Sequence, residues 1–261
     1  MTLDPKLQGK VALVTGGGTG IGRAIALALA SQGVDICIAS RTRRGEVLDA
    51  IEASGSKAKF IRVDLKDESQ VSTLATRCVS EFGSLDLLVC NAAVAIHEPA
   101  LEVSTSAWIE TMSTNLLSCM WLCRSAAQLM VANKGGSILI VGSTAQFHRA
   151  VGQTAYHVSK SALAAYSSAL ATELAAYRIR VNLLVPGRFD TAINPSFAKN
   201  DPGRDIPLGR SGEPHECGSA SVLLLSDNLS SYITGAELVV SGGLHLRPMG
   251  LQREFSASAF A

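Results

Sequence analysis

The chain has 261 residues, a length that fits one large domain or two small ones. Apolar residues make up 47% and charged residues 17%, which excludes an intrinsically disordered chain. The 23 basic and 22 acidic residues leave a formal net charge of +1, so we expect no nucleic-acid partner, because the chain lacks a large basic field.

The sequence predicts neither a membrane segment nor a metal site. No uncharged apolar run approaches the roughly 18 residues that span a bilayer, and residues 1–10 lack the apolar core of a signal peptide. We therefore expect a cytoplasmic protein with no membrane contact. The six cysteines form no CxxC pair and the histidines show no metal spacing, so no metal site is predicted. Cys119 and Cys123, four apart in an apolar helical pattern, are expected to be buried thiols.

Short apolar runs alternate with longer segments of helical periodicity along the chain. The predicted strands are Val11–Thr15, Val34–Ala39, Ala58–Val63, Leu85–Cys90, Ser137–Gly142, Ile179–Val185 and Glu237–Val240. The predicted helices cover residues 20–32, 45–54, 67–82, 104–133, 154–177 and 213–226. Apolar strands without strict alternation are typical of a parallel sheet covered on both faces. The order predicts an α/β fold over residues 1–261: a single doubly wound, Rossmann-type domain whose parallel sheet of about seven strands has helices on both faces.

One segment breaks this rhythm. Between Pro186 and Pro214 the chain has several prolines and glycines and mixed charge. Loops of this length in a compact domain are usually functional. We predict a substrate loop or lid over residues 187–213.

The first predicted strand runs into a glycine-rich segment, Thr15–Gly22, which a predicted helix follows at once. A glycine turn before a helix amino terminus is an anion site, because unpaired N–H groups and the positive helix end face the ligand. Gly16 permits a tight turn, Gly20 lets a pyrophosphate approach the backbone, and Gly22 lets the helix pack closely. A flexible turn without a ligand is the alternative.

The GxxxGxG spacing resembles the cofactor loop of the short-chain dehydrogenases/reductases, and the later motifs agree with that family in order from Gly9 to about Gly243. The resemblance implies that the loop binds the pyrophosphate and ribose of NAD or NADP. It also implies that Asp64 and Leu65 contact the adenine and that Asn91, Ala92 and Ala93 pack the adenine pocket. Ala93 departs from the Asn-Ala-Gly that the family more often has there.

The choice between NAD and NADP is argued from charge. An acidic residue after the second strand would bind the ribose 2′-hydroxyl and repel a 2′-phosphate, but Ser40 stands there and Arg41 follows. A guanidinium matches a phosphate in a bidentate fork. We therefore predict that NADP(H) is preferred and that NAD(H) is possible, with a solvated arginine loop at residues 41–44 as the alternative. Thr19 argues against NADP, since some NADP-dependent relatives have a basic residue there.

Tyr156 and Lys160 lie four apart in a predicted helix, so both side chains can address one ligand. A phenol with a pKa near 10 is poorly matched to neutral pH, and a nearby cation favours the phenolate. Ser143 follows a strand end, where ligands bind in such sheets. The resemblance implies that Ser143 binds the substrate carbonyl, that Tyr156 is the acid or base and that Lys160 holds the nicotinamide ribose and lowers the Tyr156 pKa. Asn115 would link Lys160 to solvent through a water-mediated proton relay.

The segment Pro186–Thr191 resembles the PGxxxT motif of the family. The resemblance implies that the Phe189 backbone binds the carboxamide and that Thr191 contacts the carboxamide or phosphate. The Phe189 ring is expected to narrow the pocket. Gln153 and the neighbouring residues 146–148 are candidates for the substrate site, whereas His157 should face away from Tyr156 toward the surface or another subunit.

The predicted sites are therefore as follows. The catalytic residues are Asn115, Ser143, Tyr156 and Lys160, and the substrate-binding residues are Ser143, Gln153 and Tyr156. The cofactor-binding residues are Gly16, Thr19, Gly20, Ile21, Gly22, Ser40, Arg41, Asp64, Leu65, Asn91, Tyr156, Lys160, Pro186, Gly187, Phe189 and Thr191.

These residues predict an NADP-dependent carbonyl reductase or alcohol dehydrogenase acting on a small-molecule substrate. The pattern is nearest to 3-oxoacyl-acyl-carrier-protein reductases, with sugar or polyol dehydrogenases and steroid dehydrogenases as alternatives. A non-catalytic NADP-sensing protein or a sugar-nucleotide epimerase is less well supported, because Tyr156 and Lys160 are present and few residues follow them. The apolar helices at 104–133 and 154–177 predict a homo-oligomer, a tetramer or dimer.

Overall fold

The computed structural model describes residues 4–148, 150–189 and 205–246. Seven parallel strands form one sheet in the order β3-β2-β1-β4-β5-β6-β7. Strand order reverses between β1 and β4, which is the switch point where ligands bind in open α/β sheets. The predicted doubly wound sheet is confirmed. The strands are β1 (Val11–Thr15), β2 (Asp35–Ser40), β3 (Ala58–Arg62), β4 (Leu87–Cys90), β5 (Gly136–Val141), β6 (Ile179–Pro186) and β7 (Glu237–Val240).

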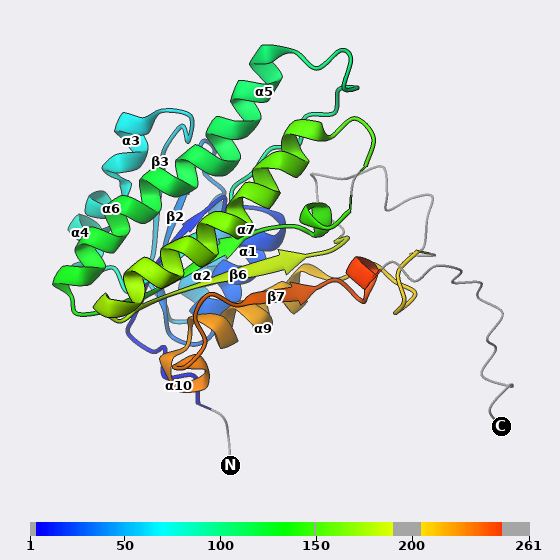
Figure 1. The fold of residues 1–261 in the computed structure, drawn as a ribbon. Coiled ribbons are helices and arrows are strands. Elements are labelled where there is room, and N and C mark those ends of the chain that lie inside the picture. The colour runs from blue at the N-terminus through cyan, green and yellow to red at the C-terminus, as the bar shows by residue number, and fades with distance from the viewer. Residues whose placement is uncertain (1–3, 149, 190–204, 247–261) are drawn as a thin grey trace, which may run out of the picture.

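Helices cover both faces of the sheet (Figure 1). One layer packs residues of α4, α6 and α7 against the sheet, and the other packs residues of α1, α2 and α9. The helices are α1 (Gly20–Ala30), α2 (Gly45–Ala53), α3 (Glu68–Ser72), α4 (Leu74–Phe82), α5 (Thr105–Met112), α6 (Ser118–Ala132), α7 (Thr154–Leu174), α9 (Pro214–Leu225) and α10 (Asp227–Ser230).

The strands are buried on both faces, as their continuous apolar runs predict. Leu13 and Val14 are consecutive in β1, yet Leu13 belongs to the α4/α6/α7 core and Val14 to the α1/α2/α9 core. This alternation follows from the period of two in a strand. Because apolar side chains pack against both faces of the central strands, the loops at the carboxyl ends of these strands begin from well-fixed positions.

Two predicted helices are divided in the structure. The prediction over 104–133 becomes α5, a π-helical turn (Ser113–Leu117) and α6, and the prediction over 67–82 becomes α3 and α4. The Asp67 side chain begins α3 by accepting from the N–H groups of Ser69 and Gln70. Apolar periodicity alone does not show such breaks, since the buried face continues through them.

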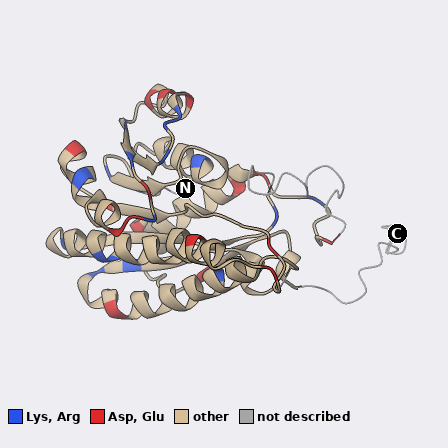
Figure 2. Ribbon diagram, turned by 90° about the horizontal axis from the view of Figure 1, so that it is seen from above, with Lys and Arg blue, Asp and Glu red and all other residues tan. Residues whose placement is uncertain are grey.

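The distribution of charged residues in the structure agrees with the near-zero net charge of the sequence. Basic and acidic residues are interspersed over both helical layers rather than separated into faces (Figure 2). No helix within the described ranges is long and apolar enough to cross a membrane.

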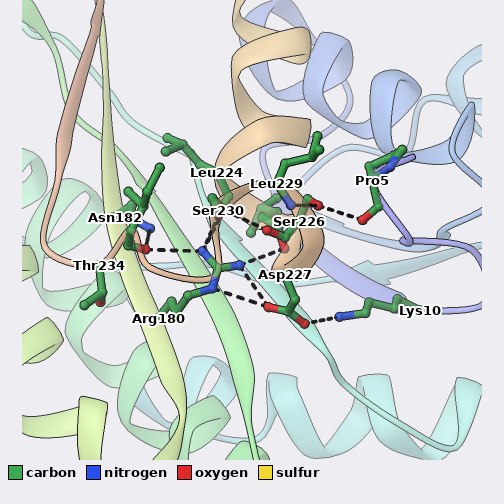
Figure 3. Close-up of polar contacts among 12 residues, drawn as sticks. Pro5, Lys10, Arg180, Asn182, Leu224, Ser226, Asp227, Leu229, Ser230 and Thr234 are labelled. Carbon is green, nitrogen blue, oxygen red and sulfur yellow. Dashed lines mark hydrogen bonds and ion pairs between the residues drawn. The ribbon is translucent and has the colours of Figure 1, made fainter. Parts of the chain in front are cut away.

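A buried cation organises the amino-terminal edge of the sheet (Figure 3). The Arg180 guanidinium, on β6, donates to the carbonyl oxygens of Leu224 and Leu225 at 2.7 and 3.1 Å and to Asp227 Oδ1 at 3.0 Å. These contacts satisfy carbonyls at the carboxyl end of α9, which have no partner within the helix. Asp227 also accepts from Lys10 Nζ at 2.6 Å, so β6, α9, α10 and the residue before β1 are held together.

Candidate active site

A cavity of about 270 Å³ opens at the carboxyl ends of the strands. It is bordered by segments after β1, β2, β3, β4, β5 and β6 and by α7. All the predicted cofactor-binding residues among the described ones line it; they are Gly16, Thr19, Gly20, Ile21, Gly22, Ser40, Arg41, Asp64, Leu65, Asn91, Tyr156, Lys160, Pro186, Gly187 and Phe189. Thr191 lies outside the described residues, as do residues 190–204 of the predicted lid.

Six further lining residues were not predicted: Val63, Lys66, Val94, Thr114, Val141 and Gly142. Most of them adjoin a predicted strand end, so the general rule that ligands bind at carboxyl ends could have identified them. Thr114 carries no such signal, because it reaches the cavity from the π-helical turn.

The glycine loop has the geometry that an anion needs. Gly16 and Gly20 adopt positive φ angles of 66° and 53°, which L side chains rarely adopt. A Cβ on Gly22 would lie 2.3 Å from Asn91 Nδ2 and 2.4 Å from the Gly16 oxygen, so only glycine fits there. Thr19 precedes α1 without a capping side-chain bond, and the first turn of α1 has no acidic residue. The first N–H groups of α1 therefore remain available to a ligand in the cavity.

Asn91 ties the glycine loop to β4. Its amide Nδ2 donates to the Thr15 oxygen at 3.0 Å, and its backbone N–H donates to Thr15 Oγ1 at 3.0 Å. Because these bonds bridge β1 and β4, they fix the loop at the switch point of the sheet. Asn91 also lines the cavity, where the adenine contact was predicted.

Cationic side chains lie at the end of the cavity formed by β2 and β3. Arg41 and Lys66 both line it, whereas Arg43 and Arg44 do not. Arg44 packs against the glycine loop instead, since a Cβ on Gly18 would lie 2.9 Å from its Cγ. Ser40 Oγ donates to the Thr42 oxygen at 2.8 Å. Position 40 carries no acidic residue, and Arg41 and Lys66 outnumber Asp64 at this end, so it suits an anionic group.

Ser143, Tyr156 and Lys160 meet at the other end of the cavity. Ser143 begins a short 3-10 helix, and its Oγ accepts from the Ala145 N–H at 3.1 Å. Lys160 is buried, its Nζ lies 5.8 Å from the centre of the Tyr156 ring and it donates to the Val141 oxygen at 2.8 Å. The structure thus brings together the three groups that the motifs predicted.

The electrostatics correct one expectation. Burial raises the pKa of Tyr156, and a hydrogen bond with Ser143 acts in the opposite direction. In the protein alone the pKa of Tyr156 is therefore raised overall, where the resemblance implied a lowered value. Burial also lowers the pKa of Lys160 to about 8, so the same apolar surroundings disfavour both charged forms.

Asn115 lies in the π-helical turn, buried behind the cavity. Its Oδ1 accepts from the Val94 N–H at 2.8 Å, and its Nδ2 donates to the Val94 oxygen at 2.9 Å and to Ser159 Oγ at 3.0 Å. Within the described ranges no direct bond joins it to Lys160. Asn115 therefore connects the segment after β4 to the helix that carries Tyr156 and Lys160.

Two predicted environments, those of His157 and Gln153, differ from the structure. His157 is buried rather than at the surface, because the segment after Ser143 folds over it. Gln153 does not line the cavity; its Nε2 lies 3.0 Å from His97 Nε2. The Phe189 ring packs against Gly212, where a Cβ would lie 2.5 Å from the ring, and Phe189 also lines the cavity that it was predicted to narrow.

All six cysteines are buried and free. The structure brings the sulfurs of Cys90, Cys119 and Cys123 within 4.8 Å of one another, a cluster that their spacing did not predict. A tetrahedral zinc site needs a fourth ligand. No other His, Cys, Asp or Glu of the described part of the chain joins the cluster, and the three thiols pack in the apolar core as expected for Cys119 and Cys123.

Comparisons with known proteins agree with this geometry. A family model described as enoyl-(acyl carrier protein) reductase matches residues 16–245. The chain is 37% identical to the 3-oxoacyl-[acyl-carrier-protein] reductase of Mus musculus, over 91% of this chain and 98% of that protein. It is 34% identical to the 2-dehydro-3-deoxy-D-gluconate 5-dehydrogenase of Dickeya dadantii, over 91% and 96%. The solved 3-oxoacyl (acyl-carrier-protein) reductase from Agrobacterium tumefaciens C58 with NADP bound has a TM-score of 0.85 and 30% identity, over 92% and 95%.

Proposed function

The chain belongs to the short-chain dehydrogenase/reductase family, and from that premise we propose that it is an NADP(H)-dependent carbonyl reductase or secondary-alcohol dehydrogenase. Membership makes it an oxidoreductase that transfers hydride between a nicotinamide cofactor and a C=O or CH–OH group. The observation that carries the finer proposal is the meeting of Ser143, Tyr156 and Lys160 in one cavity with the glycine loop.

The residues present fit a dinucleotide. The free N–H groups at the start of α1 suit a pyrophosphate, and Asp64, Leu65 and Asn91 border the place for the adenine. Pro186, Gly187 and Phe189 border the opposite end, beside Tyr156 and Lys160. When bound, a nicotinamide supplies or accepts the hydride.

The side chains handle the proton and the carbonyl oxygen. Tyr156 donates a proton to the oxygen during reduction, and the Ser143 hydroxyl donates a hydrogen bond to it. Lys160 has three N–H donors, of which the Val141 oxygen accepts one. The others would be available to the ribose hydroxyls of a bound cofactor, and the ammonium favours the Tyr156 phenolate. Asn115 acts by holding Ser159, and through it the helix, in place.

We propose NADP(H) as the preferred cofactor. Ser40 carries no charge to repel a 2′-phosphate, and Arg41 offers a guanidinium beside it in the cavity. The NADP-bound relative from Agrobacterium tumefaciens supports the same choice. NAD(H) remains a second possible cofactor in this proposal.

The relatives favour two substrate classes. The 3-oxoacyl thioester class has support from the Mus musculus reductase at 37% identity. A keto sugar acid is the second candidate, favoured by the Dickeya dadantii dehydrogenase at 34% identity. Either substrate presents a ketone to Ser143 and Tyr156, so the same chemistry serves both.

We also propose that the protein is a cytoplasmic homo-oligomer, a tetramer or dimer. Apolar side chains on α5, α6 and α7 are exposed in the isolated chain, among them Ile109, Met120, Val131 and Val158. Large exposed apolar patches mark interaction surfaces. Light scattering is expected to give a mass above 27.3 kDa.

The test is NADPH oxidation by the purified protein with a 3-oxoacyl thioester, a keto sugar acid and a ketosteroid. We expect turnover of at least one substrate, with a higher kcat/KM for NADPH than for NADH. Tyr156→Phe should lower kcat by about a thousandfold, because it removes the transferable proton, while NADPH still binds. An active Tyr156→Phe variant would refute the mechanism, and a wild-type protein that binds no NADPH would refute the function.

A further inference from the structure

His157 is a buried imidazole beside the proposed acid Tyr156. It lies on the first turn of α7 and is 6% exposed. Its Nδ1 lies 2.9 Å from the Ala145 oxygen, and its Nε2 accepts from the Ala150 N–H at 2.8 Å and lies 3.2 Å from the Ala150 oxygen. Both ring nitrogens therefore contact the connection between β5 and α7, which also carries Ser143.

The shorter contacts assign the tautomer. The Ala150 N–H can only donate, and it lies closer to Nε2 than the Ala150 oxygen does, so we assign Nε2 as the acceptor, without a proton in the neutral ring. Nδ1 then carries the proton and donates it to the Ala145 oxygen. The ring thus accepts from the Ala150 N–H through one nitrogen and donates to the Ala145 oxygen through the other. An apolar side chain, or one with only a donor or only an acceptor, cannot make both bonds.

One of these contacts leads directly to the reaction centre. Ala145 accepts from His157 through its oxygen, while its N–H donates to Ser143 Oγ at 3.1 Å. A single residue therefore separates the imidazole from the hydroxyl that is proposed to bind the carbonyl. The second contact, at Ala150, holds the other half of the connection close to the start of α7.

We infer that His157 is a positioning residue, which sets the place of the Ser143 hydroxyl relative to Tyr156 by fastening the β5–α7 connection to the helix that bears Tyr156. His157 does not line the cavity, so it acts through Ala145 and not on the substrate. Without His157, fewer hydrogen bonds would join α7 to the connection. The Ser143 and Tyr156 hydroxyls, which act on one carbonyl oxygen, would then no longer be held at a fixed distance from each other. This inference rests on the proposed function, in which Ser143 and Tyr156 act on the same oxygen.

Three substitutions separate the two contacts. H157F fills the space and removes both bonds, H157N keeps a donor near the position of Nδ1, and H157Q keeps an acceptor near the position of Nε2. We expect H157F to lower kcat by about tenfold, because small misplacements of reacting groups are costly. NADPH affinity should stay within about twofold, since the glycine loop is untouched. H157N should recover most of the lost kcat, and H157Q should recover less of it.

A second measurement does not depend on turnover. Amide hydrogen exchange of Ala145, and of the peptide that spans residues 143–148, should be faster in H157F than in the wild type and close to wild type in H157N. A protein that reduces none of the carbonyls would refute the proposed function, while this exchange measurement would still decide whether His157 fixes the connection.

The matched control is Ser230→Ala, which removes buried hydrogen bonds beside Arg180, far from the cavity. It should lower Tm without changing kcat, which separates lost stability from lost positioning. The inference is overturned if H157F retains kcat within about twofold of wild type, if Ala145 exchange is unchanged, or if H157Q recovers kcat as well as H157N does.

Discussion

The sheet holds one buried cation at each end, and the two are bonded very differently. Arg180, near the amino end of β6, is 8% exposed and donates to Asp227, Ser230 and carbonyl oxygens of α9. Lys160, beside the carboxyl end of β5, is 2% exposed and donates to Val141. No carboxylate within the described ranges pairs with Lys160, whereas Arg180 forms an ion pair at 3.0 Å.

The comparison distinguishes Arg180, which stabilises the fold, from Lys160, which lines the candidate active site. The bonds of Arg180 replace the water it loses on burial, and Asp227 completes the charge balance. Burial acts to raise the pKa of Asp227, but its bonds and charge pairs with Lys10 and Arg180 lower it overall. Lys160 loses its water without such replacement, and its pKa falls to about 8. Its unused donors face the cavity that we assign to the cofactor.

Replacing Lys160 with Met should produce the largest effect, and in opposite directions for activity and stability. kcat should fall by at least about a hundredfold, because Tyr156 loses the neighbouring cation. The free energy of unfolding at pH 7 should rise by up to about 3 kcal/mol, since burial of the charged amine is no longer needed. Enzyme assays and urea titration measure the two effects, with Lys57→Met as the control, because the Lys57 side chain is 80% exposed and lies outside the cavity lining.

The same variant has a defined pH dependence. The unfolded chain binds the Lys160 proton up to about pH 10.5, but the folded protein releases it near pH 8. Between these values the unfolded state holds more protons, so wild-type stability attributable to this residue rises with pH. The advantage of the Met variant should therefore shrink from pH 8 to pH 10. A constant difference across that range would contradict the contrast drawn between the two cations.

Replacing Arg180 with Met should have the reverse outcome. It leaves the carbonyl oxygens of Leu224 and Leu225 without their donor, so the free energy of unfolding should fall by about 3 kcal/mol. kcat below the melting temperature should stay near wild type, because the cavity lies at the other edge. Thermal unfolding and an activity assay at low temperature test this, and a stable Arg180→Met protein would show that its bonds contribute little.

Replacing Arg41 with Ala should have the smallest effect. We expect the KM for NADPH to rise about tenfold while the KM for NADH changes little, because only the former has a 2′-phosphate. Arg43→Ala is the matched control, since Arg43 has the same charge but does not line the cavity. If both substitutions raised the KM for NADPH equally, the effect would come from the general positive charge of this segment and not from a bond between Arg41 and the 2′-phosphate.

Local features were predictable, and their predictions hold well. β1 and β7 have the predicted bounds, since turn residues border both apolar runs. The glycine loop and Tyr156 with Lys160 were predicted because each motif is contiguous, and strand ends in a parallel sheet converge. Their meeting in one cavity follows from topology, which the strand and helix alternation already indicates.

Features that depend on distant partners were not predictable. His157 was expected at the surface because helix geometry gives only its direction, and the segment that covers it is irregular. Asn115 bonds Val94 and Ser159 through a π-helical turn that leaves no periodic signal. The raised pKa of Tyr156 depends on burial, whose extent a helical spacing of four does not give.

Because all six thiols are buried in the described part of the chain, the protein exposes no cysteine to thiol-reactive reagents. A maleimide reagent should leave the folded wild-type protein unlabelled, so native cysteines need not be removed before a dye is attached. Val151, which is 96% exposed in the connection that follows Ser143, is a suitable place for one new cysteine. A fluorophore there would report on the connection between β5 and α7 as cofactor and substrate bind, in an otherwise unaltered chain.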